Sequence, residues 1–145
     1  MEDLRVAIGS DHGGFFYKQK IIEYLKSRNI PFTDVGTYTR EACDYPKIAH
    51  DVAELVISGQ ANRGILICGT GIGMSIAANK VRGIRAALCG DTYSARVSRA
   101  HNNANVLCLG ERVIGEHLAL DIVDIWLKSA FENGSRHARR VSMIE

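Results

Sequence analysis

One segment of the chain brings together a thiol, a hydroxyl and three glycines. Cys68 ends an apolar run and is followed by Gly69, Thr70, Gly71, Ile72 and Gly73. Glycines let neighbouring backbone N–H groups face one point, and a helix that begins there adds its partial positive charge. Such a nest stabilises an anion, whether a phosphate or an enediolate, and a helix N-terminus favours the thiolate form of a nearby cysteine. The segment therefore predicts an anion site beside a candidate cysteine base.

Acid, base and amide side chains flank other apolar runs. Asp11 and His12 follow the first run, and His101 and Asn102 precede the last. Histidine gives and takes protons near neutral pH, so it suits general acid–base catalysis. We expect both histidines to lie on strand-end loops of one face of the molecule, near Cys68. For Asp11, the roles of reacting acid and of helix N-cap both stay open.

Three arginines are candidates for binding a phosphate group. The planar guanidinium of Arg112, Arg136 or Arg140 matches phosphate oxygens, although most surface arginines are simply solvated. Arg136 and Arg140 are four residues apart, so they share one face if this segment is helical. The C-terminal stretch is therefore a candidate phosphate clamp.

Two other interpretations of the glycine-rich segment stay open. Cys68 can be a buried packing thiol, which is the interpretation we favour for Cys89 and Cys108 because neither precedes a glycine nest. A nucleotide-binding loop is the other. The dinucleotide pattern G-x-G-x-x-G would need a glycine at Met74, but Asp91 lies about 20 residues further on, where such folds carry an acidic residue.

Length and composition exclude several classes of protein. The chain has 145 residues, 46% of them hydrophobic and 23% charged, with a net charge of +2. We expect one domain spanning residues 1–145, with no basic surface for nucleic acid and no apolar run near the roughly 20 residues that span a membrane. The four cysteines form no C-x-x-C pair and the five histidines no H-x-x-x-H pair, which argues against a zinc site. We expect free thiols, no secretory signal and a cytoplasmic protein.

Short apolar runs alternate with amphipathic segments, which is typical of a repeating β–α pattern. The runs at 4–8, 64–68 and 105–109 are continuous, as in strands buried on both faces of a parallel sheet. Two further strands are expected at 32–35 and 85–89. Helices are expected at 15–28, 46–58, 72–81, 91–101 and 115–131, with a short one after Gly134. This order predicts a doubly wound α/β sandwich of about five strands, with ligands at the carboxyl ends of the strands.

Five stretches of the sequence together resemble the ribose-5-phosphate isomerase B family. They are GSDHGGF at 9–15, DYP at 44–46, GILICGTGIGMSIAANK at 64–80, RAA at 85–87 and HNNAN at 101–105. The resemblance spans nearly the whole chain, and the wider group includes the subunits of galactose-6-phosphate isomerase. It implies a Rossmann-like three-layer αβα sandwich that forms a homodimer or tetramer, with active sites at the dimer interface. It also implies interconversion of ribose 5-phosphate and ribulose 5-phosphate without a metal or an organic cofactor.

The resemblance implies a role for each candidate residue. Cys68 resembles the proton-transferring base, His101 the residue that opens the furanose ring, and Asp11 its partner at the ring oxygen. Thr70 and the amides around Gly69, Gly71 and Gly73 resemble the site that holds the enediolate. Tyr45 and Asn102 resemble substrate contacts. The residues that resemble the phosphate site are His12, Arg112, Arg136 and Arg140.

The sequence departs from the family pattern, and two functional alternatives remain. Gly14, or alternatively Gly13, stands where we expect alanine, and Asn103 stands where aspartate is common. Relatives without the cysteine carry a glutamate at the position of Met74, so this chain resembles the cysteine type. The alternative enzyme is an isomerase of a six-carbon sugar phosphate, such as allose or galactose 6-phosphate. The alternative from another class is a nucleotide- or phosphate-binding module without catalysis.

Overall fold

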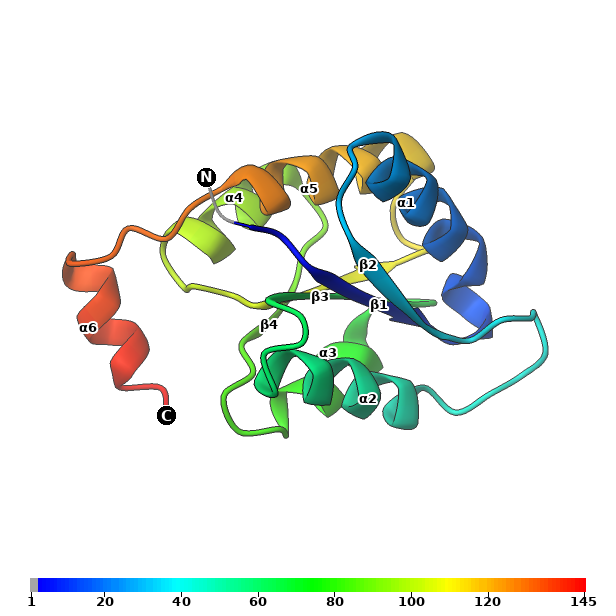
Figure 1. The fold of residues 1–145 in the computed structure, drawn as a ribbon, viewed down its shortest axis with the longest axis horizontal. Coiled ribbons are helices and arrows are strands. Elements are labelled where there is room, and N and C mark those ends of the chain that lie inside the picture. The colour runs from blue at the N-terminus through cyan, green and yellow to red at the C-terminus, as the bar shows by residue number, and fades with distance from the viewer. Residues whose placement is uncertain (1–2) are drawn as a thin grey trace.

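A parallel sheet forms the centre of the structure, a computed structural model that describes residues 3–145. Its five strands lie in the order β2-β1-β3-β5-β4 (Figure 1). The strands are β1 (Val6–Ser10), β2 (Phe32–Gly36), β3 (Arg63–Cys68), β4 (Ala86–Leu88) and β5 (Val106–Gly110). Every residue of β1, β3 and β5 is buried, which explains why their sequences are continuously apolar rather than alternating.

Helices cover both faces of the sheet and complete three layers (Figure 1). One face carries α1 (Phe15–Ser27), α4 (Thr92–Ala100) and α5 (Glu116–Lys128), and the other carries α2 (Tyr45–Ile57) and α3 (Ile72–Asn79). Successive strand residues point to opposite faces, so Ile65 joins the first core and Leu66 the second. The expected αβα sandwich with a parallel sheet of five strands is confirmed.

The ends of the elements differ from the expected ones by at most three residues. The largest difference is at α5, which was expected to reach residue 131 and ends at Lys128. Ser129 has an extended backbone with φ −84° and ψ 136°, and its hydroxyl donates to the Ile125 carbonyl at 2.6 Å. A short 3-10 helix, η1 (His12–Gly14), also precedes α1.

The strand order creates a crevice at the carboxyl edge of the sheet. The chain leaves β1 toward β2 on one side and leaves β3 toward β5 and β4 on the other, so the loops after β1 and β3 diverge. Asp11 follows β1 directly, and Cys68 is the last residue of β3. Because Ser10 lies beside Ile67 in the parallel register, Asp11 and Cys68 emerge next to one another.

The C-terminal helix α6 (Arg136–Ser142) stands apart from the three layers (Figure 1). An ion pair of 2.9 Å between Arg85 Nη1 and Glu145 Oε1 ties the end of the chain to the loop before β4. Met143 and Ile144 remain exposed at 71% and 64% of their surface. Across residues 3–145, the helices are all too short or too polar to span a bilayer.

Candidate active site

A cavity of about 470 Å³ opens where β1 and β3 end, and we call it the strand-end cavity. Most of the catalytic and substrate-binding residues expected from the sequence converge on it. The residues that line it are Asp11, Tyr45, Cys68, Gly69, Thr70, Ile72, Gly73, Ile76 and Arg112. They come from loops and helix starts after three different strands and before α2, which explains why they are far apart in the sequence.

The thiol of Cys68 lies at the base of the glycine nest. It is 6% exposed, and its Sγ accepts a hydrogen bond from the backbone N–H of Gly71 at 3.1 Å. Gly71 is the N-cap of α3 and has a φ of +81°, which favours glycine. A Cβ at this position would also lie 2.5 Å from Leu88 Cδ1. The backbone can therefore place an N–H group on the sulfur only because residue 71 has no side chain.

The neighbouring residues of the nest are held in a similar way. The Thr70 hydroxyl accepts from the N–H of Ile72, the first residue of α3, at 3.2 Å. The ring of Tyr45 packs against Gly73, where a Cβ would lie 2.6 Å from the ring carbons. The first amides of a helix have no partner within the helix, so this end of α3 presents donors to the cavity. The arrangement suits an anion bound above Cys68.

The carboxylate of Asp11 has both a structural place and a place in the cavity. Its Oδ1 accepts from the N–H of Gly13 at 2.9 Å, so the expected N-cap role is confirmed for η1. The side chain is nevertheless part of the cavity wall.

The turn after β1 also identifies which of its two glycine positions can carry alanine. A Cβ on Gly14 would lie 2.5 Å from the Ile67 carbonyl oxygen, whereas one on Gly13 would lie 3.2 Å from its nearest atom, the nitrogen of Gly69.

Arg112 supplies positive charge beside the nest. Its backbone N–H donates to the Gly69 carbonyl at 2.9 Å, and the N–H of Glu111 donates to the Cys68 carbonyl at 3.0 Å. The guanidinium Nη1 would lie 3.5 Å from a Cβ built on Gly69.

His12 lies next to Asp11 on η1, where its Nδ1 accepts from the N–H of Cys43 at 3.3 Å. His12 is exposed, and it is not among the residues that line the strand-end cavity.

His101 does not lie in the strand-end cavity, so the expectation that it shares one face with His12 and Cys68 is wrong. It is the C-cap of α4 and precedes β5. A helix between parallel strands begins at the carboxyl edge of the sheet and returns the chain to the amino edge. In the register of β3 and β5, Gly64 pairs with Val106 and Cys68 with Gly110. His101 therefore lies at the opposite end of the strands from Cys68, and these strands rise about 3.3 Å per residue.

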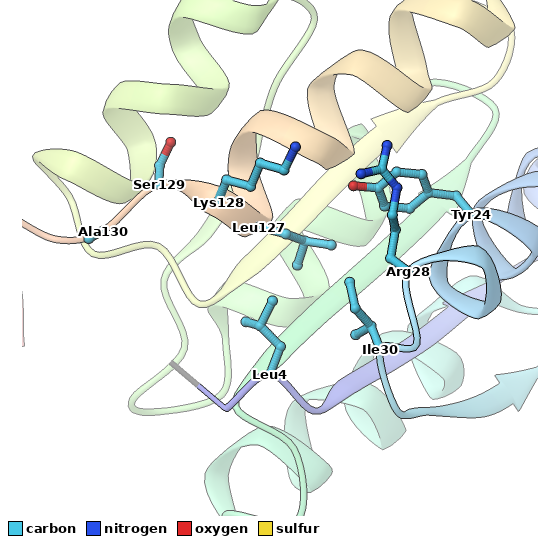
Figure 2. A pocket seen from close by; sticks show the side chains of 8 residues that line it. All are labelled: Leu4, Tyr24, Arg28, Ile30, Leu127, Lys128, Ser129 and Ala130. Carbon is cyan, nitrogen blue, oxygen red and sulfur yellow. The ribbon is translucent and has the colours of Figure 1, made fainter. Parts of the chain in front are cut away.

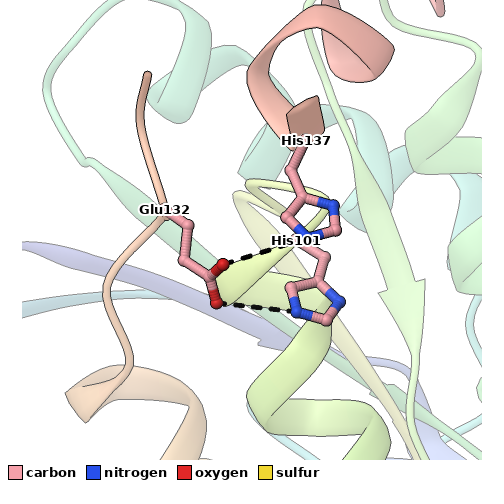
Figure 3. Close-up of side chains that lie close together, drawn as sticks. All are labelled: His101, Glu132 and His137. Atoms are coloured by element: carbon pink, nitrogen blue, oxygen red, sulfur yellow. Dashed lines mark ion pairs between the residues drawn. The ribbon is translucent and has the colours of Figure 1, made fainter. Parts of the chain in front are cut away.

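A second cavity, of about 370 Å³, surrounds His101 at this amino edge. Its lining is His101, Asn102, His137, Arg140, Val141 and Ile144. The rings of His101 and His137 stack with their centroids 4.0 Å apart and their planes 9° from parallel. Glu132 faces both rings, with carboxylate oxygens 3.5 Å from His101 Nε2 and 3.9 Å from His137 Nε2 (Figure 3). Burial, followed by the charges of His101 and Arg136, lowers the pKa of His137.

Sequence reasoning missed Glu132 and His137. His137 follows Arg136 directly, so its place beside the expected phosphate clamp was a usable signal. Glu132 lies in the loop before α6 and meets the rings only because α6 docks there.

The side chains of His101, Glu132 and His137 are of types that bind metals, and their ligand atoms lie within 4.8 Å of one another. However, the nearly parallel planes direct the ring lone pairs side by side instead of toward one point, which does not suit tetrahedral coordination.

Cys89 and Cys108 are buried and packed in the core, as expected. Burial raises the pKa of Cys89 to about 11 and raises that of Cys108 further. Cys108 is fully buried within β5, and Cys89 belongs to the core beside α4. All four cysteines are free thiols. Among them, Cys68 is the one whose sulfur faces a cavity lined by polar groups.

A third cavity, of about 410 Å³, lies between α1 and α5 (Figure 2). Aliphatic side chains of Leu4, Ile30 and Leu127 form its floor, and the longer side chains of Arg28 and Lys128 stand at its rim (Figure 2). The Tyr24 hydroxyl at its wall is hydrogen-bonded to Asp124. The lining holds no residue from the candidate site, and its chemistry differs from that of the polar strand-end cavity.

Comparison with known proteins identifies the family. The family described as Ribose/Galactose Isomerase matches residues 6–144. The ribose-5-phosphate isomerase B of Escherichia coli is 50% identical over 140 residues, which cover 97% of this chain and 93% of that protein. The D-erythrulose-4-phosphate isomerase of Pectobacterium atrosepticum is 48% identical over 132 residues, which cover 90% and 87%.

A solved structure agrees with these sequence matches. The ribose-5-phosphate isomerase B of Clostridium thermocellum superposes with a TM-score of 0.95 at 57% identity, and the match covers 97% of this chain and 95% of that one. The chain therefore belongs to the Ribose/Galactose Isomerase family and is a sugar-phosphate isomerase of the ribose-5-phosphate isomerase B type.

Proposed function

We propose that the protein interconverts ribose 5-phosphate and ribulose 5-phosphate through an enediolate, with Cys68 as the base and with no metal or organic cofactor. The observation that carries the proposal is the Cys68 thiol, held at the glycine nest and facing the strand-end cavity. The name of the Escherichia coli relative supports the choice of substrate.

The chemistry requires two stages. Ribose 5-phosphate is mainly a closed furanose, so an acid and a base must first open the ring and produce a carbonyl. A single base then removes the proton from C2 and returns it to C1. Cys68 can perform both transfers, because the thiol formed in the first is the acid for the second. The nest donors would stabilise the charge that develops on the enediolate, and one well-placed donor contributes about 3 kcal/mol.

The other residues take roles that match their chemistry. We assign ring opening to His101 with Asp11, and the enediolate site to Thr70 and the amides around Gly69, Gly71 and Gly73. Tyr45 and Asn102 contact the sugar. Phosphate binding is assigned to His12, Arg112, Arg136 and Arg140.

These roles require two copies of the chain. Cys68 and His101 lie at opposite edges of one sheet, so we propose that the strand-end cavity of one protomer receives His101 and α6 of its partner. Exposed apolar side chains beside the strand-end cavity support an interface there. They are Ile72, Ile76, Leu88 and Val113, at 52%, 58%, 44% and 66% exposure. Arg112 would then come from one protomer, and Arg136 and Arg140 from the other.

Two features bear on the remaining alternatives. A relative of similar identity is named for a four-carbon ketose phosphate, so family membership alone does not decide the length of the sugar. A six-carbon sugar phosphate would use the same residues. The free state of all four cysteines supports a reducing compartment such as the cytoplasm.

A direct assay tests the proposal. The protein is treated with excess chelator, and kcat/KM is measured for ribose 5-phosphate, allose 6-phosphate and erythrulose 4-phosphate. We expect full activity after chelation and the highest kcat/KM for ribose 5-phosphate. Activity that zinc or magnesium restores would contradict the metal-free mechanism. A higher kcat/KM for another sugar phosphate would make that sugar phosphate the substrate in place of ribose 5-phosphate. If nucleotides stabilise the protein and no sugar phosphate is isomerised, the result would favour a nucleotide-binding module without catalysis.

A further inference from the structure

We propose that Glu132 and His137 are positioning residues for His101, holding its ring and its proton in the state that ring opening requires. The proposal rests on the proposed function, because it assumes that His101 opens the sugar ring. Neither residue was among the site residues expected from the sequence, and both belong to the segment 132–142 that contacts the end of α4.

The geometry places one carboxylate against two stacked imidazoles. Glu132 Oε2 lies 3.5 Å from His101 Nε2, and Glu132 Oε1 lies 3.9 Å from His137 Nε2. The second ring nitrogen of His101 points away from the carboxylate (Figure 3). The ring of His137 stacks on the ring of His101 with a centroid distance of 4.0 Å, so it limits how far the His101 ring can rotate. The two contacts together restrict the orientation of the His101 ring.

Backbone hydrogen bonds hold this arrangement in place. The N–H of Glu132 donates to the Ala100 carbonyl at 3.0 Å, beside His101 in the sequence. The Ser135 hydroxyl donates to the Glu132 carbonyl at 2.5 Å and accepts from the N–H of His137 at 3.1 Å. His137 is 8% exposed, whereas its neighbours Arg136 and Arg140 are exposed. The end of α4, the loop and the start of α6 are therefore linked at the point where the rings stack.

The chemistry explains why such support is needed. In ring opening, a base takes the proton from the C1 hydroxyl, the bond between C1 and the ring oxygen breaks, and an acid gives a proton to that oxygen. A carboxylate near Nε2 keeps a proton on that nitrogen and leaves the other nitrogen as the acceptor. Without the carboxylate, the imidazole can exchange its tautomer and lose the acceptor that faces the substrate.

The charges around His101 oppose one another. The carboxylate of Glu132 faces both rings, whereas Arg136 and Arg140 on α6 carry positive charge on the same side of the molecule. Burial, followed by the charges of His101 and Arg136, lowers the pKa of His137. Removing the charge of Glu132 takes away the carboxylate that faces His101 Nε2, so the pH profile on the cyclic sugar should change.

The test uses Glu132→Gln, which keeps the shape and removes the charge, and His137→Phe, which keeps a ring for stacking. Glu145→Gln is the matched control, because this carboxylate binds Arg85 and not the two rings. Two reactions are followed across pH. The first is kcat and KM with cyclic ribose 5-phosphate, and the second is exchange of solvent deuterium into ribulose 5-phosphate, which needs no ring opening. The imidazole signals of His101 are titrated by NMR, assigned through His101→Asn.

We expect Glu132→Gln to reduce kcat on the cyclic sugar roughly tenfold, less than the roughly 10²-fold loss for a missing general base. The pH profile of this variant on the cyclic sugar and its His101 titration should differ from those of the wild-type protein, while deuterium exchange and the Glu145→Gln control stay unchanged. His137→Phe should reduce kcat on the cyclic sugar and spare the exchange. Equal losses in both reactions, or an unchanged His101 titration in Glu132→Gln, would overturn the proposal. If the wild-type protein does not isomerise ribose 5-phosphate, the proposed function fails, and the NMR titration still tests the coupling.

Discussion

At the scale of single residues, Cys68 and its glycine nest are local in the sequence. The thiol, the N–H group of Gly71 and the Thr70 hydroxyl lie within four positions, so a strand followed by a helix is enough to bring them together. This is why the nest could be predicted from residue types alone. Tyr45, which also lines the cavity, needed the family resemblance, because only the completed sheet brings it near Cys68.

The first prediction concerns the base. Cys68→Ala should reduce kcat by at least roughly 10²-fold, because the step that moves the proton loses its general base. Substrate binding, measured by calorimetry, should remain close to that of the wild-type protein, since the proposed phosphate contacts are elsewhere. Cys108→Ala is the control, because this thiol lies within the core and not at the cavity. A Cys68→Ala variant that keeps more than a tenth of the wild-type kcat would rule out the assignment.

The second prediction separates ring opening from proton transfer. His101→Asn should lose most of its activity on cyclic ribose 5-phosphate, because the closed ring offers no carbonyl to acidify the neighbouring C–H bond. It should lose much less in deuterium exchange from ribulose 5-phosphate, which cannot close a furanose ring through its phosphorylated C5 oxygen. His117→Asn serves as the control, because this histidine is exposed on α5. Equal losses in both reactions would mean that His101 supports the proton transfer itself.

At the scale of elements, the strands and helices follow directly from hydrophobic periodicity. The error about His101 arose one level higher, because residues before and after a strand were both treated as strand-end loops. The chain direction decides between them. α4 starts near Asp91 at the carboxyl edge and ends at His101 at the amino edge, whereas Gly110 to Arg112 follow β5 and do reach the cavity.

One element depends on a buried lysine that no sequence pattern indicated. Lys18 on α1 is fully buried, with Nζ 2.6 Å from Asp34 Oδ1 and 2.6 Å from the Thr37 carbonyl. The ammonium group therefore ties α1 to β2 and to the loop that leads toward Tyr45. A lysine in an amphipathic helix is normally expected on the solvated face, so only tertiary packing reveals this role.

The third prediction follows from this contact. Lys18→Met should lower the free energy of unfolding by about 3 kcal/mol, because it leaves the Asp34 carboxylate and the Thr37 carbonyl without their partner. Denaturant unfolding at one fixed protein concentration measures the change. Lys47→Met is the control, because its ion pair with Asp51 at 2.8 Å is exposed and should contribute little. Equal stabilities for the two variants would show that the buried pair does not stabilise the fold.

At the scale of the whole molecule, the candidate site residues fall into two groups at opposite edges of the sheet. One holds the proposed base and the enediolate nest, and the other holds His101 with Glu132, His137 and the arginine-bearing helix α6. The αβα architecture expected from the sequence is confirmed, and the extent of the domain at residues 1–145 stays a prediction. The position of α6 could not be predicted, because a helix of seven residues has no periodicity strong enough to indicate its partner.

The central claim is that each active site combines Cys68 of one protomer with His101 of the other. Heterodimers isolated with two different affinity tags test it directly, using cyclic ribose 5-phosphate as substrate. A heterodimer of Cys68→Ala with His101→Asn contains one intact site and one doubly altered site. It should therefore show about half of the wild-type activity, although both parent homodimers are nearly inactive.

The reciprocal heterodimer is the matched control. It pairs the wild-type chain with the double variant Cys68→Ala/His101→Asn, so each of its shared sites lacks one of the two groups. The account predicts that this heterodimer is nearly inactive while the first is half-active. An inactive first heterodimer and a half-active reciprocal one would place Cys68 and His101 of each site in the same protomer, and would contradict the account.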